Sequence, residues 1–176
     1  MTNHYGFYLD VNNCLGCGAC IKACSNKNNL PFSVKYRRIR QIEKSDHDQG
    51  QISRFFLSTA CNHCTNPECM GVCPSGAYAK RRDGIVIHLP DKCTACKSCV
   101  ASCPFGAPQF NPLTGKAAKC QMCYERLDRG ERPHCVEACI TGALQLRNLE
   151  EFPMKKLVPL TVSLPTIRLT RPSTYY

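Results

Sequence analysis

The stretch that decides the fold is residues 93–104, which read Cys-Thr-Ala-Cys-Lys-Ser-Cys-Val-Ala-Ser-Cys-Pro. Three cysteines follow one another at gaps of two residues, and a fourth follows after a gap of three. Residues 14–24 (Cys-Leu-Gly-Cys-Gly-Ala-Cys-Ile-Lys-Ala-Cys) repeat this spacing. All 16 cysteines of the 176-residue chain fall into four groups of four. The groups are Cys14, Cys17, Cys20 and Cys24; Cys61, Cys64, Cys69 and Cys73; Cys93, Cys96, Cys99 and Cys103; and Cys120, Cys123, Cys135 and Cys139.

The first and third groups have the spacing with which bacterial two-cluster ferredoxins bind iron–sulfur clusters. Three cysteines on one tight loop can reach three corners of a [4Fe–4S] core. The fourth begins a segment that leads away, so it ligates the other cluster of a pair. We therefore predict four [4Fe–4S] clusters as cofactors, with iron bound through all sixteen cysteines.

Three other uses of cysteine are less consistent with this pattern. Disulfides would suit a secreted chain, but no signal peptide is apparent in the sequence. Structural zinc would fit the fourth group alone, yet it leaves the third and fourth thiols of the first and third groups unexplained. Thioredoxin-type redox chemistry needs one exposed pair of cysteines. We expect no catalytic residues, because every group is complete and no nucleophile–base arrangement is apparent.

The charge and the apolar content also favour clusters. The formal net charge is +10, but 16 thiolates and four cores of about +2 each would bring the loaded chain to about +2. We therefore expect no nucleic-acid partner. Hydrophobic residues make up 43% of the chain, and 16 of them are cysteines. Without these, roughly a third of the chain is apolar, which is little for a packed core. No run is long enough to span a membrane.

A short turn is repeated after the last cysteine of three groups, at residues 73–77 (Cys-Pro-Ser-Gly-Ala), 103–107 (Cys-Pro-Phe-Gly-Ala) and 139–143 (Cys-Ile-Thr-Gly-Ala). Glycine permits a tight reversal there, and proline fixes φ. Strand-like sequences follow at 84–88 and 143–146. Each unit thus reads as a ligand loop, a short helix, a turn and a short strand, which is half of a ferredoxin module.

The segments between the groups carry weaker signals. Residues 4–11 predict a strand, and residues 34–43 and 51–59 predict a β-hairpin around turn-forming residues. Residues 124–130 predict a short helix that ends at glycine. The hairpin residues Arg37, Arg38 and Arg40 are expected either to face a partner or to form a solvated face.

The order of the groups leaves two pairings open. The second and third groups lie close in sequence, so they can form one module with the first and fourth paired around it. Sequential pairing of first with second and third with fourth is the alternative. Residues 150–176 contain four prolines and predict an extended arm that lies against the chain's own body or against a partner, with free disorder as the alternative.

Several stretches resemble one known family. They are residues 5–10 (Tyr-Gly-Phe-Tyr-Leu-Asp), 58–64 (Ser-Thr-Ala-Cys-Asn-His-Cys), 73–78 (Cys-Pro-Ser-Gly-Ala-Tyr), 83–84 (Asp-Gly), 103–111 (Cys-Pro-Phe-Gly-Ala-Pro-Gln-Phe-Asn) and 119–124 (Lys-Cys-Gln-Met-Cys-Tyr). The chain is similar, over residues 4–149, to the iron–sulfur subunit of the dimethyl sulfoxide reductase family of molybdopterin oxidoreductases. The resemblance implies a non-catalytic wire between a molybdenum or tungsten catalytic subunit and a quinone-linked membrane subunit or another redox partner.

The resemblance also implies nested pairing and four ligand sets, which we call sites a to d. Site a is Cys14, Cys17, Cys20 and Cys139; site b is Cys120, Cys123, Cys135 and Cys24; site c is Cys61, Cys64, Cys69 and Cys103; and site d is Cys93, Cys96, Cys99 and Cys73. His63 and His134 lie next to ligand cysteines and are expected to serve as hydrogen-bonding or surface residues.

The implied fold class is α+β, with two nested bacterial-ferredoxin-like modules that are rich in loops. Residues 1–24 and 104–149 form the outer module, 61–103 the inner module, 25–60 a β-hairpin insertion and 150–176 the extended arm. A freestanding polyferredoxin carrier is the alternative function. We expect a peripheral position, with a catalytic partner and a membrane anchor as a further candidate. The cellular location is extracytoplasmic if the chain is exported with its partner, and otherwise cytoplasmic.

The cluster prediction is tested by metal content. Anaerobically purified protein should contain about 16 iron and 16 sulfide atoms per chain, because each [4Fe–4S] core supplies four of each. Elemental analysis and acid-labile sulfide determination measure both. About four zinc atoms per chain with little sulfide would contradict the prediction.

Overall fold

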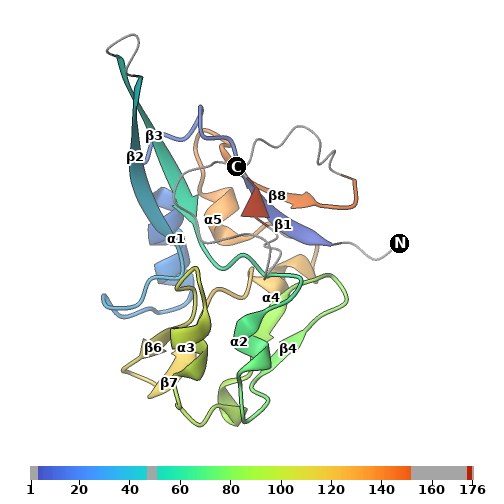
Figure 1. The fold of residues 1–176 in the computed structure, drawn as a ribbon. Helices are drawn as coiled ribbons and strands as arrows, with labels where there is room; N and C mark the ends of the chain where they lie inside the picture. Colours follow the sequence, from blue (N-terminus) through green and yellow to red (C-terminus); the bar gives the residue numbers. More distant parts are fainter. Residues whose placement is uncertain (1–3, 47–50, 152–173, 176) are drawn as a thin grey trace.

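The computed structural model describes residues 4–46, 51–151 and 174–175 (Figure 1). Within these residues the strands form one three-stranded and three two-stranded sheets. The strands are β1 (Tyr5–Leu9), β2 (Arg38–Asp46), β3 (Gln51–Thr59), β4 (Tyr78–Lys80), β5 (Val86–His88), β6 (Gln109–Asn111), β7 (Lys116–Ala118), β8 (Leu144–Asn148) and β9 (Thr174–Tyr175). The helices are α1 (Ala19–Lys27), α2 (Glu68–Gly71), α3 (Ser98–Ser102), α4 (Tyr124–Leu127) and α5 (His134–Glu137), with a 3₁₀ helix, η1, at Pro90–Lys92.

Elements from the beginning and the end of the described residues lie together. β1 pairs antiparallel with β8, with Tyr5 opposite Asn148 and Leu9 opposite Leu144. Helix α1 contacts α5, whereas α2 contacts α3. Figure 1 shows β1, β8, α1 and α5 in the upper half of the molecule, and α2 and α3 side by side in the lower half. Segments more than a hundred residues apart in sequence therefore share one half of the molecule.

The predicted strand and hairpin are confirmed with shifted ends. β1 begins at Tyr5, and β2 and β3 pair antiparallel from Arg38 opposite Thr59. β2 begins at Arg38 rather than at Val34, because the Val34 N–H donates to the Pro31 carbonyl (2.9 Å) in a turn that precedes the strand. The hairpin projects from the upper half of the molecule in Figure 1.

Helices α1 and α4 show how the local sequence sets an element's length. α1 continues to Lys27, past the module boundary expected at residue 24, since no proline follows Cys24 to end it. Helix α4 ends at Leu127, and Gly130 follows with φ +75°, which confirms the short helix predicted over 124–130.

Two short hairpins were not predicted as such. β4 pairs with β5, which places Tyr78 opposite His88. β6 pairs with β7 around a turn in which Asn111 Oδ1 accepts a hydrogen bond from the Leu113 N–H (3.0 Å). The strands predicted at 84–88 and 143–146 are confirmed as β5 and β8, with shifted ends. β4, β6 and β7 were not predicted, because strands of three residues carry little hydrophobic periodicity.

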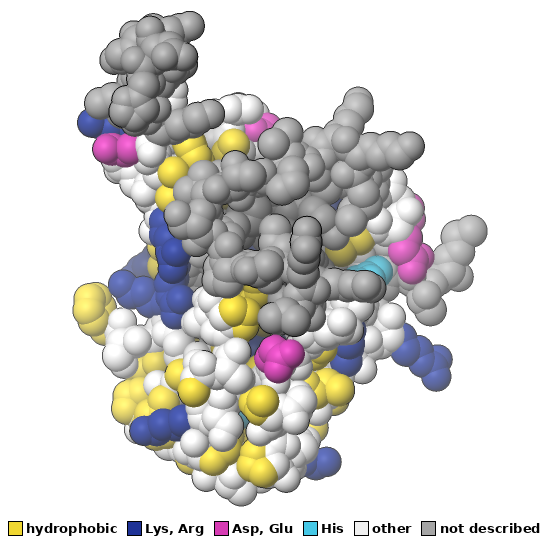
Figure 2. Space-filling model, viewed as in Figure 1, with side chains coloured by type: hydrophobic (Ala, Val, Ile, Leu, Met, Phe, Trp, Pro, Cys, Tyr) yellow, Lys and Arg dark blue, Asp and Glu magenta, His cyan; other side chains and the backbone are white. Residues whose placement is uncertain are grey.

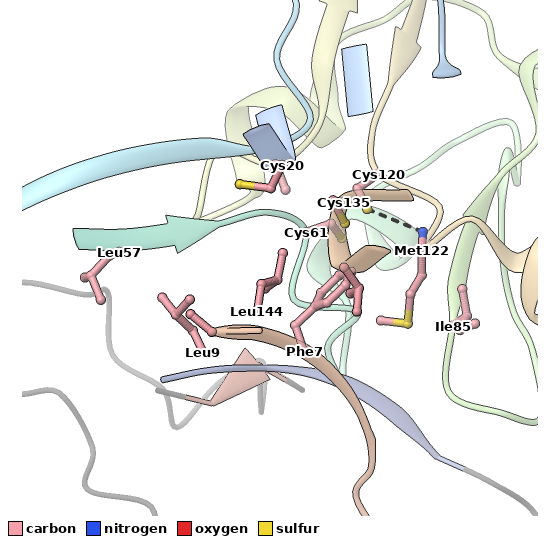
Figure 3. Packing of buried hydrophobic residues seen from close by; sticks show 13 residues of the cluster. Phe7, Leu9, Cys20, Leu57, Cys61, Ile85, Cys120, Met122, Cys135 and Leu144 are labelled. Carbon is pink, nitrogen blue, oxygen red and sulfur yellow. Dashed lines mark hydrogen bonds between the residues drawn. The ribbon is translucent and has the colours of Figure 1, made fainter. Parts of the chain in front are cut away.

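The buried core is small and contains much sulfur. Phe7 and Leu9 point from one face of β1 toward Leu57 and Leu144, each at most 2% exposed (Figure 3). Buried cysteines, among them Cys120, belong to the same cluster. The packing of the described residues thus depends on the cysteine-bearing loops as well as on aliphatic side chains. On the face shown in Figure 2, several Lys and Arg side chains gather at the left edge below the hairpin, and others are scattered over the lower half.

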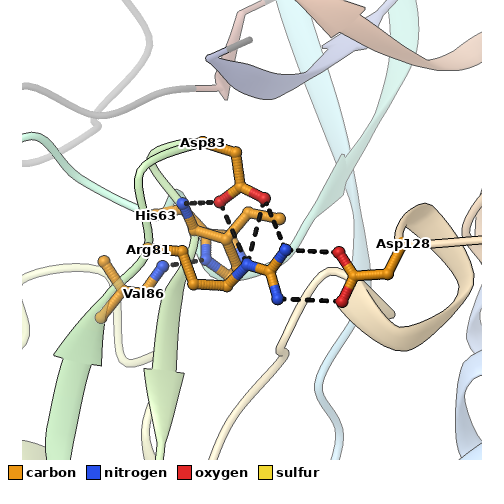
Figure 4. Close-up of polar contacts among 6 residues, drawn as sticks. His63, Arg81, Asp83, Val86 and Asp128 are labelled. Carbon is orange, nitrogen blue, oxygen red and sulfur yellow. Dashed lines mark hydrogen bonds and ion pairs between the residues drawn. The ribbon is translucent and has the colours of Figure 1, made fainter. Parts of the chain in front are cut away.

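The turn between β4 and β5 contacts both β1 and the residue after α4, and Figure 4 shows Arg81 and Asp83 of this turn with Asp128. The Arg81 guanidinium forms ion pairs with Asp83 (3.0 Å) and Asp128, next to the C-terminal end of α4. The Tyr5 N–H donates to the Asp83 carbonyl (3.0 Å), which ties β1 to the same turn. Arg81 also lies over the Tyr124 ring, 5.0 Å from its centroid.

Only part of the predicted arm can be described. Residues 152–173 lie outside the described residues, whereas β9 pairs parallel with β1, with Phe7 opposite Thr174. The end of the arm therefore lies against the protein's own body. In the described part of the sequence, no helix is long and apolar enough to cross a membrane.

Removing iron should unfold this protein, because its apolar core is small and no disulfide links the cysteine loops, all of which lie in the described residues. When a chelator strips the clusters anaerobically, we expect the near-UV and far-UV circular dichroism signals to decrease together. The control is the loaded protein kept in the same buffer without chelator. An apoprotein that keeps its far-UV signal and unfolds cooperatively on heating would contradict this expectation.

Candidate iron–sulfur sites

Each of the four groups begins with the same left-handed turn. The residue two positions after its first cysteine has a positive φ, which for a residue with a side chain costs about 1–2 kcal/mol. These residues are Gly16 (+67°), His63 (+45°), Ala95 (+61°) and Met122 (+56°). The turn aims backbone N–H groups at sulfur: Ala95 N lies 3.4 Å from Cys93 Sγ, and Met122 N lies 3.3 Å from Cys120 Sγ (Figure 3).

A helix carries the third cysteine of each group, and α1 also carries Cys24. These third cysteines are Cys20 in α1, Cys69 in α2, Cys99 in α3 and Cys135 in α5, and all four are buried. The contacts α1–α5 and α2–α3 thus bring Cys20 near Cys135 and Cys69 near Cys99. The first of these contacts joins helices of the first and fourth cysteine groups, and the second joins helices of the second and third groups.

The repeated turn after the last cysteine is present in the structure. Gly76, Gly106 and Gly142 all have positive φ. In two of the turns a backbone N–H donates to the cysteine sulfur. Ala77 N lies 3.3 Å from Cys73 Sγ, and Leu144 N lies 3.3 Å from Cys139 Sγ. Such bonds stabilise a thiolate more than a neutral thiol.

Three cavities are each lined by the four cysteines of one predicted set. The lining cysteines are Cys14, Cys17, Cys20 and Cys139 in one; Cys24, Cys120, Cys123 and Cys135 in the second; and Cys61, Cys64, Cys69 and Cys103 in the third. These are the cysteines of sites a, b and c. Each cavity combines three cysteines of one group with a fourth from another part of the sequence.

The cysteines of site d also lie near one another. The negative charge of Cys96 acts on Cys73, and the charges of Cys93 and Cys73 act on Cys99. Cys99 and Cys69 are buried in one hydrophobic cluster, with Cys73 and Cys93 packed against it. Site d therefore adjoins site c.

Interactions between neighbouring cysteines connect the four sites in the order a, b, c, d, and we call this order the row. The charge of Cys135 in site b raises the pKa of Cys20 in site a. The charge of Cys61 in site c likewise raises the pKa of Cys120 in site b. Site c adjoins site d. All sixteen cysteines lie in the described residues, and among them only Cys17 in site a and Cys96 in site d are exposed. These two cysteines mark the ends of the row.

The thiols have the chemistry that a cluster requires only when they are deprotonated. Burial raises the pKa of Cys24 and of Cys69 to about 12 and that of Cys120 well above its usual value. At neutral pH these three thiols are protonated in the empty fold, so loading must release their protons and supply positive charge. At Cys96, by contrast, the Ser98 hydroxyl lowers the pKa.

The cysteines surround space rather than a point. Among the described residues, no group of three or more His, Cys, Asp or Glu side chains is placed to hold a single metal ion. A zinc site would bring four sulfur atoms within about 2.3 Å of one centre. Four sulfur atoms around an open cavity instead suit a core of several atoms, and this geometry fits the predicted clusters.

Two buried cations lie beside the cysteines, and neither was predicted. Lys119 is 1% exposed, and its Nζ donates to the carbonyls of Cys120 (3.0 Å) and Val86. Its charge lowers the pKa of Cys69 against the larger effect of burial. Arg37 is 2% exposed, so the expectation that it faces a partner or solvent is wrong. Arg38 is half-buried and donates to the Gly106 carbonyl (3.1 Å), whereas Arg40 is exposed.

The histidines act as predicted. His63 Nδ1 accepts a hydrogen bond from the Val86 N–H (3.1 Å), and burial keeps the pKa of His63 well below its usual value (Figure 4). His134 Nδ1 lies 2.9 Å from Arg126 Nη1. Both are hydrogen-bonding residues.

Comparisons with known proteins agree with this geometry. Two family models, both described as a 4Fe-4S dicluster domain, match residues 52–149 and 13–77. The sequence is 40% identical to YnfG, a probable anaerobic dimethyl sulfoxide reductase component of Escherichia coli, over 98% of its own length and 88% of the relative's. It is 37% identical to the thiosulfate reductase electron transfer subunit PhsB of Salmonella typhi, over 90% of its own length and 83% of the relative's.

The protein belongs to the iron–sulfur subunits of the dimethyl sulfoxide reductase family. A further relative, the B subunit of anaerobic dimethyl sulfoxide reductase from Haemophilus influenzae, is 36% identical over 96% of this sequence and 86% of its own. This iron–sulfur subunit is accordingly an electron-transfer protein with four [4Fe–4S] clusters and no catalytic role of its own.

Substitution of Gly16 should impair site a. An alanine Cβ there would lie 2.6 Å from the Phe56 ring, whereas one at Gly18 would meet nothing within 4 Å, although both residues have positive φ. We expect Gly16→Ala to lower the iron content and the stability more than Gly18→Ala, by about 1–3 kcal/mol for the overpacking. Iron analysis and thermal unfolding of both variants measure this, and equal losses would show that the contact with Phe56 is unimportant.

Proposed function

We propose that this iron–sulfur subunit relays electrons between a molybdopterin-containing catalytic subunit and a second redox partner, with site a nearest the catalytic subunit. The observation that carries the proposal is the row of four cysteine sites in which Cys17 and Cys96, at the two ends, are the exposed cysteines of the described residues. Each [4Fe–4S] cluster takes up and releases one electron at a time. A row with two accessible ends suits a protein that receives electrons at one end and delivers them at the other.

The ligand sets a to d are part of this proposal. The cavities lined by the cysteines of sites a, b and c support them, as does the closeness of the four cysteines of site d. The same holds for two nested ferredoxin-like modules. The contacts α1–α5 and β1–β8 support an outer module, and α2–α3 supports an inner one. Sequential pairing would require α1 to pack against α2 instead.

The surface around site a suits a permanent protein partner. Leu15 (62% exposed) lies between Cys14 and Cys17, and Ile140 (78% exposed) follows Cys139. Exposed aliphatic side chains on both loops of one site would be unfavourable in water, and a protein partner would bury them. The catalytic subunit is the partner proposed for this surface, and the substrate of the complex is then that subunit's own.

Site d is the proposed entrance for the second partner. Met70 (41% exposed) and Val72 (37% exposed) lie between Cys69 and Cys73, and Cys96 is exposed. With a quinone-linked membrane subunit at this end, the protein would be a peripheral component of a membrane-bound complex. Relatives that are named as components of reductases support a catalytic partner.

Co-purification tests the assignment of site a. We expect the native protein to elute from a size-exclusion column together with a large molybdopterin subunit. The double substitution Leu15→Glu and Ile140→Glu should weaken this co-elution at least tenfold, because it places two charges in the proposed interface. Iron content should stay at about 16 per chain, since neither residue supplies a ligand.

Leu113→Glu is the matched control, since Leu113 is 74% exposed but lies in the β6–β7 turn. It should leave co-elution unchanged. If the native protein elutes alone, the freestanding polyferredoxin carrier is the correct function. If Leu113→Glu disrupts the complex and the double variant does not, the catalytic subunit binds elsewhere.

A further inference from the structure

Arg37 is a fully enclosed cation just before β2. Its Nη1 donates to the Ser58 carbonyl (3.3 Å) and to Ser58 Oγ (3.1 Å), and its guanidinium lies over the Phe7 ring, 4.4 Å from the centroid. These contacts come from β1 and β3. They hold the guanidinium in one place but supply no negative charge.

Two nitrogen atoms of the Arg37 guanidinium form no hydrogen bond with the described residues. Arg37 Nε and Nη2 are buried without a hydrogen-bond partner among the described residues. No Asp or Glu in the described part of the sequence forms an ion pair with Arg37. A buried charge without a counter-charge costs several kcal/mol, so a protein keeps one only where an anion offsets it.

The groups around Arg37 that can become anionic are cysteines of two different sites. Its charge interacts with Cys20 of site a and with Cys24, Cys120 and Cys135 of site b. Arg37 itself lines the cavity of site b. It also reaches site a through Ser58, whose Oγ lies 3.4 Å from Cys20 Sγ. Arg37 therefore stands between the two sites.

We propose that Arg37 is an electrostatic positioning residue that raises the reduction potentials of the clusters at sites a and b together. The proposal rests on the ligand sets given above. A [4Fe–4S] cluster with four thiolates is anionic, and reduction adds another negative charge. A fixed cation beside it stabilises the reduced form more than the oxidised form, and net charge and hydrogen bonds to sulfur are known determinants of cluster potential.

Distance makes the effect largest at sites a and b, although the charge of Arg37 also reaches His63, which lines the cavity of site c. Coulomb energy falls with separation and is largest where water is excluded, as it is around Arg37. Sites c and d follow b in the row, and the cation beside site c is Lys119. Arg37 should thus favour the presence of electrons at the a–b end of the row.

Redox titration of the loaded protein, followed by EPR, tests this inference. Arg37→Gln should lower the midpoint potentials of two of the four centres. We expect at least a tenfold change in each one-electron equilibrium, which is about 59 mV. Arg37→Lys keeps the charge and should restore most of both potentials. Arg82→Gln removes an equal charge from a position outside the core and should move none of the four.

The outcomes are distinct. Four equal shifts in Arg37→Gln, or none, would overturn the inference. Should Arg37→Gln load fewer than four clusters, iron counts decide: a role of the charge predicts full loading in Arg37→Lys, whereas equal loss in both variants would show a packing role only. A wrong ligand set would instead appear when two cysteines of one proposed set are substituted together, because the variant would then alter two centres rather than one. That outcome leaves the Arg37 titration readable.

Discussion

Four sulfur atoms must surround each cavity, and in every case they come from two separate stretches of the sequence. This constraint determines the rest of the structure. Cys139 can meet Cys14 only if the beginning and the end of the cysteine-bearing region lie together, and the pairing of β1 with β8 and of α1 with α5 follows from that. The aliphatic core is too small to impose such an arrangement alone. The left-handed turns at His63, Ala95 and Met122 show backbone strain accepted in order to aim the loops.

Charge is the second consequence of placing sulfur inside a protein. Burial raises the pKa of thiols such as Cys24, yet only thiolates bind iron. The protein offsets this conflict locally, with backbone N–H donors at Cys120 and Cys139 and with the cations Arg37 and Lys119. The formal charge of +10 is therefore in part an interior property of the protein.

The sequence was sufficient where one residue type determines one structure. Cysteine spacing indicated the cofactors, and the cluster prediction is confirmed by the family, whereas the ligand sets stay predictions. The hairpin and the helix before Gly130 followed from local turn chemistry. The different burial of Arg37, Arg38 and Arg40 could not be predicted, because the three arginines lie in similar local sequence. Burial of Arg37 depends on Ser58 and Phe7, which are distant in the sequence. The extension of α1 was readable in principle from the missing proline after Cys24.

The half of the row with sites a and b differs from the half with sites c and d in a way that a symmetric pair of ferredoxin modules would not explain. Among the last cysteines of the four groups, only Cys24 is not followed by the Cys-x-x-Gly turn. Cys24 lies inside α1, and the Asn28 side-chain amide lies 3.7 Å from its sulfur. After this longer helix the backbone enters the segment that carries Arg37, whose charge interacts with Cys20 of site a and Cys24 of site b. No corresponding insertion separates the second and third groups in the sequence. The hairpin insertion thus does more than extend the surface: the residue just before its first strand carries a charge into the interior, and its second strand supplies the serine that holds that charge in place.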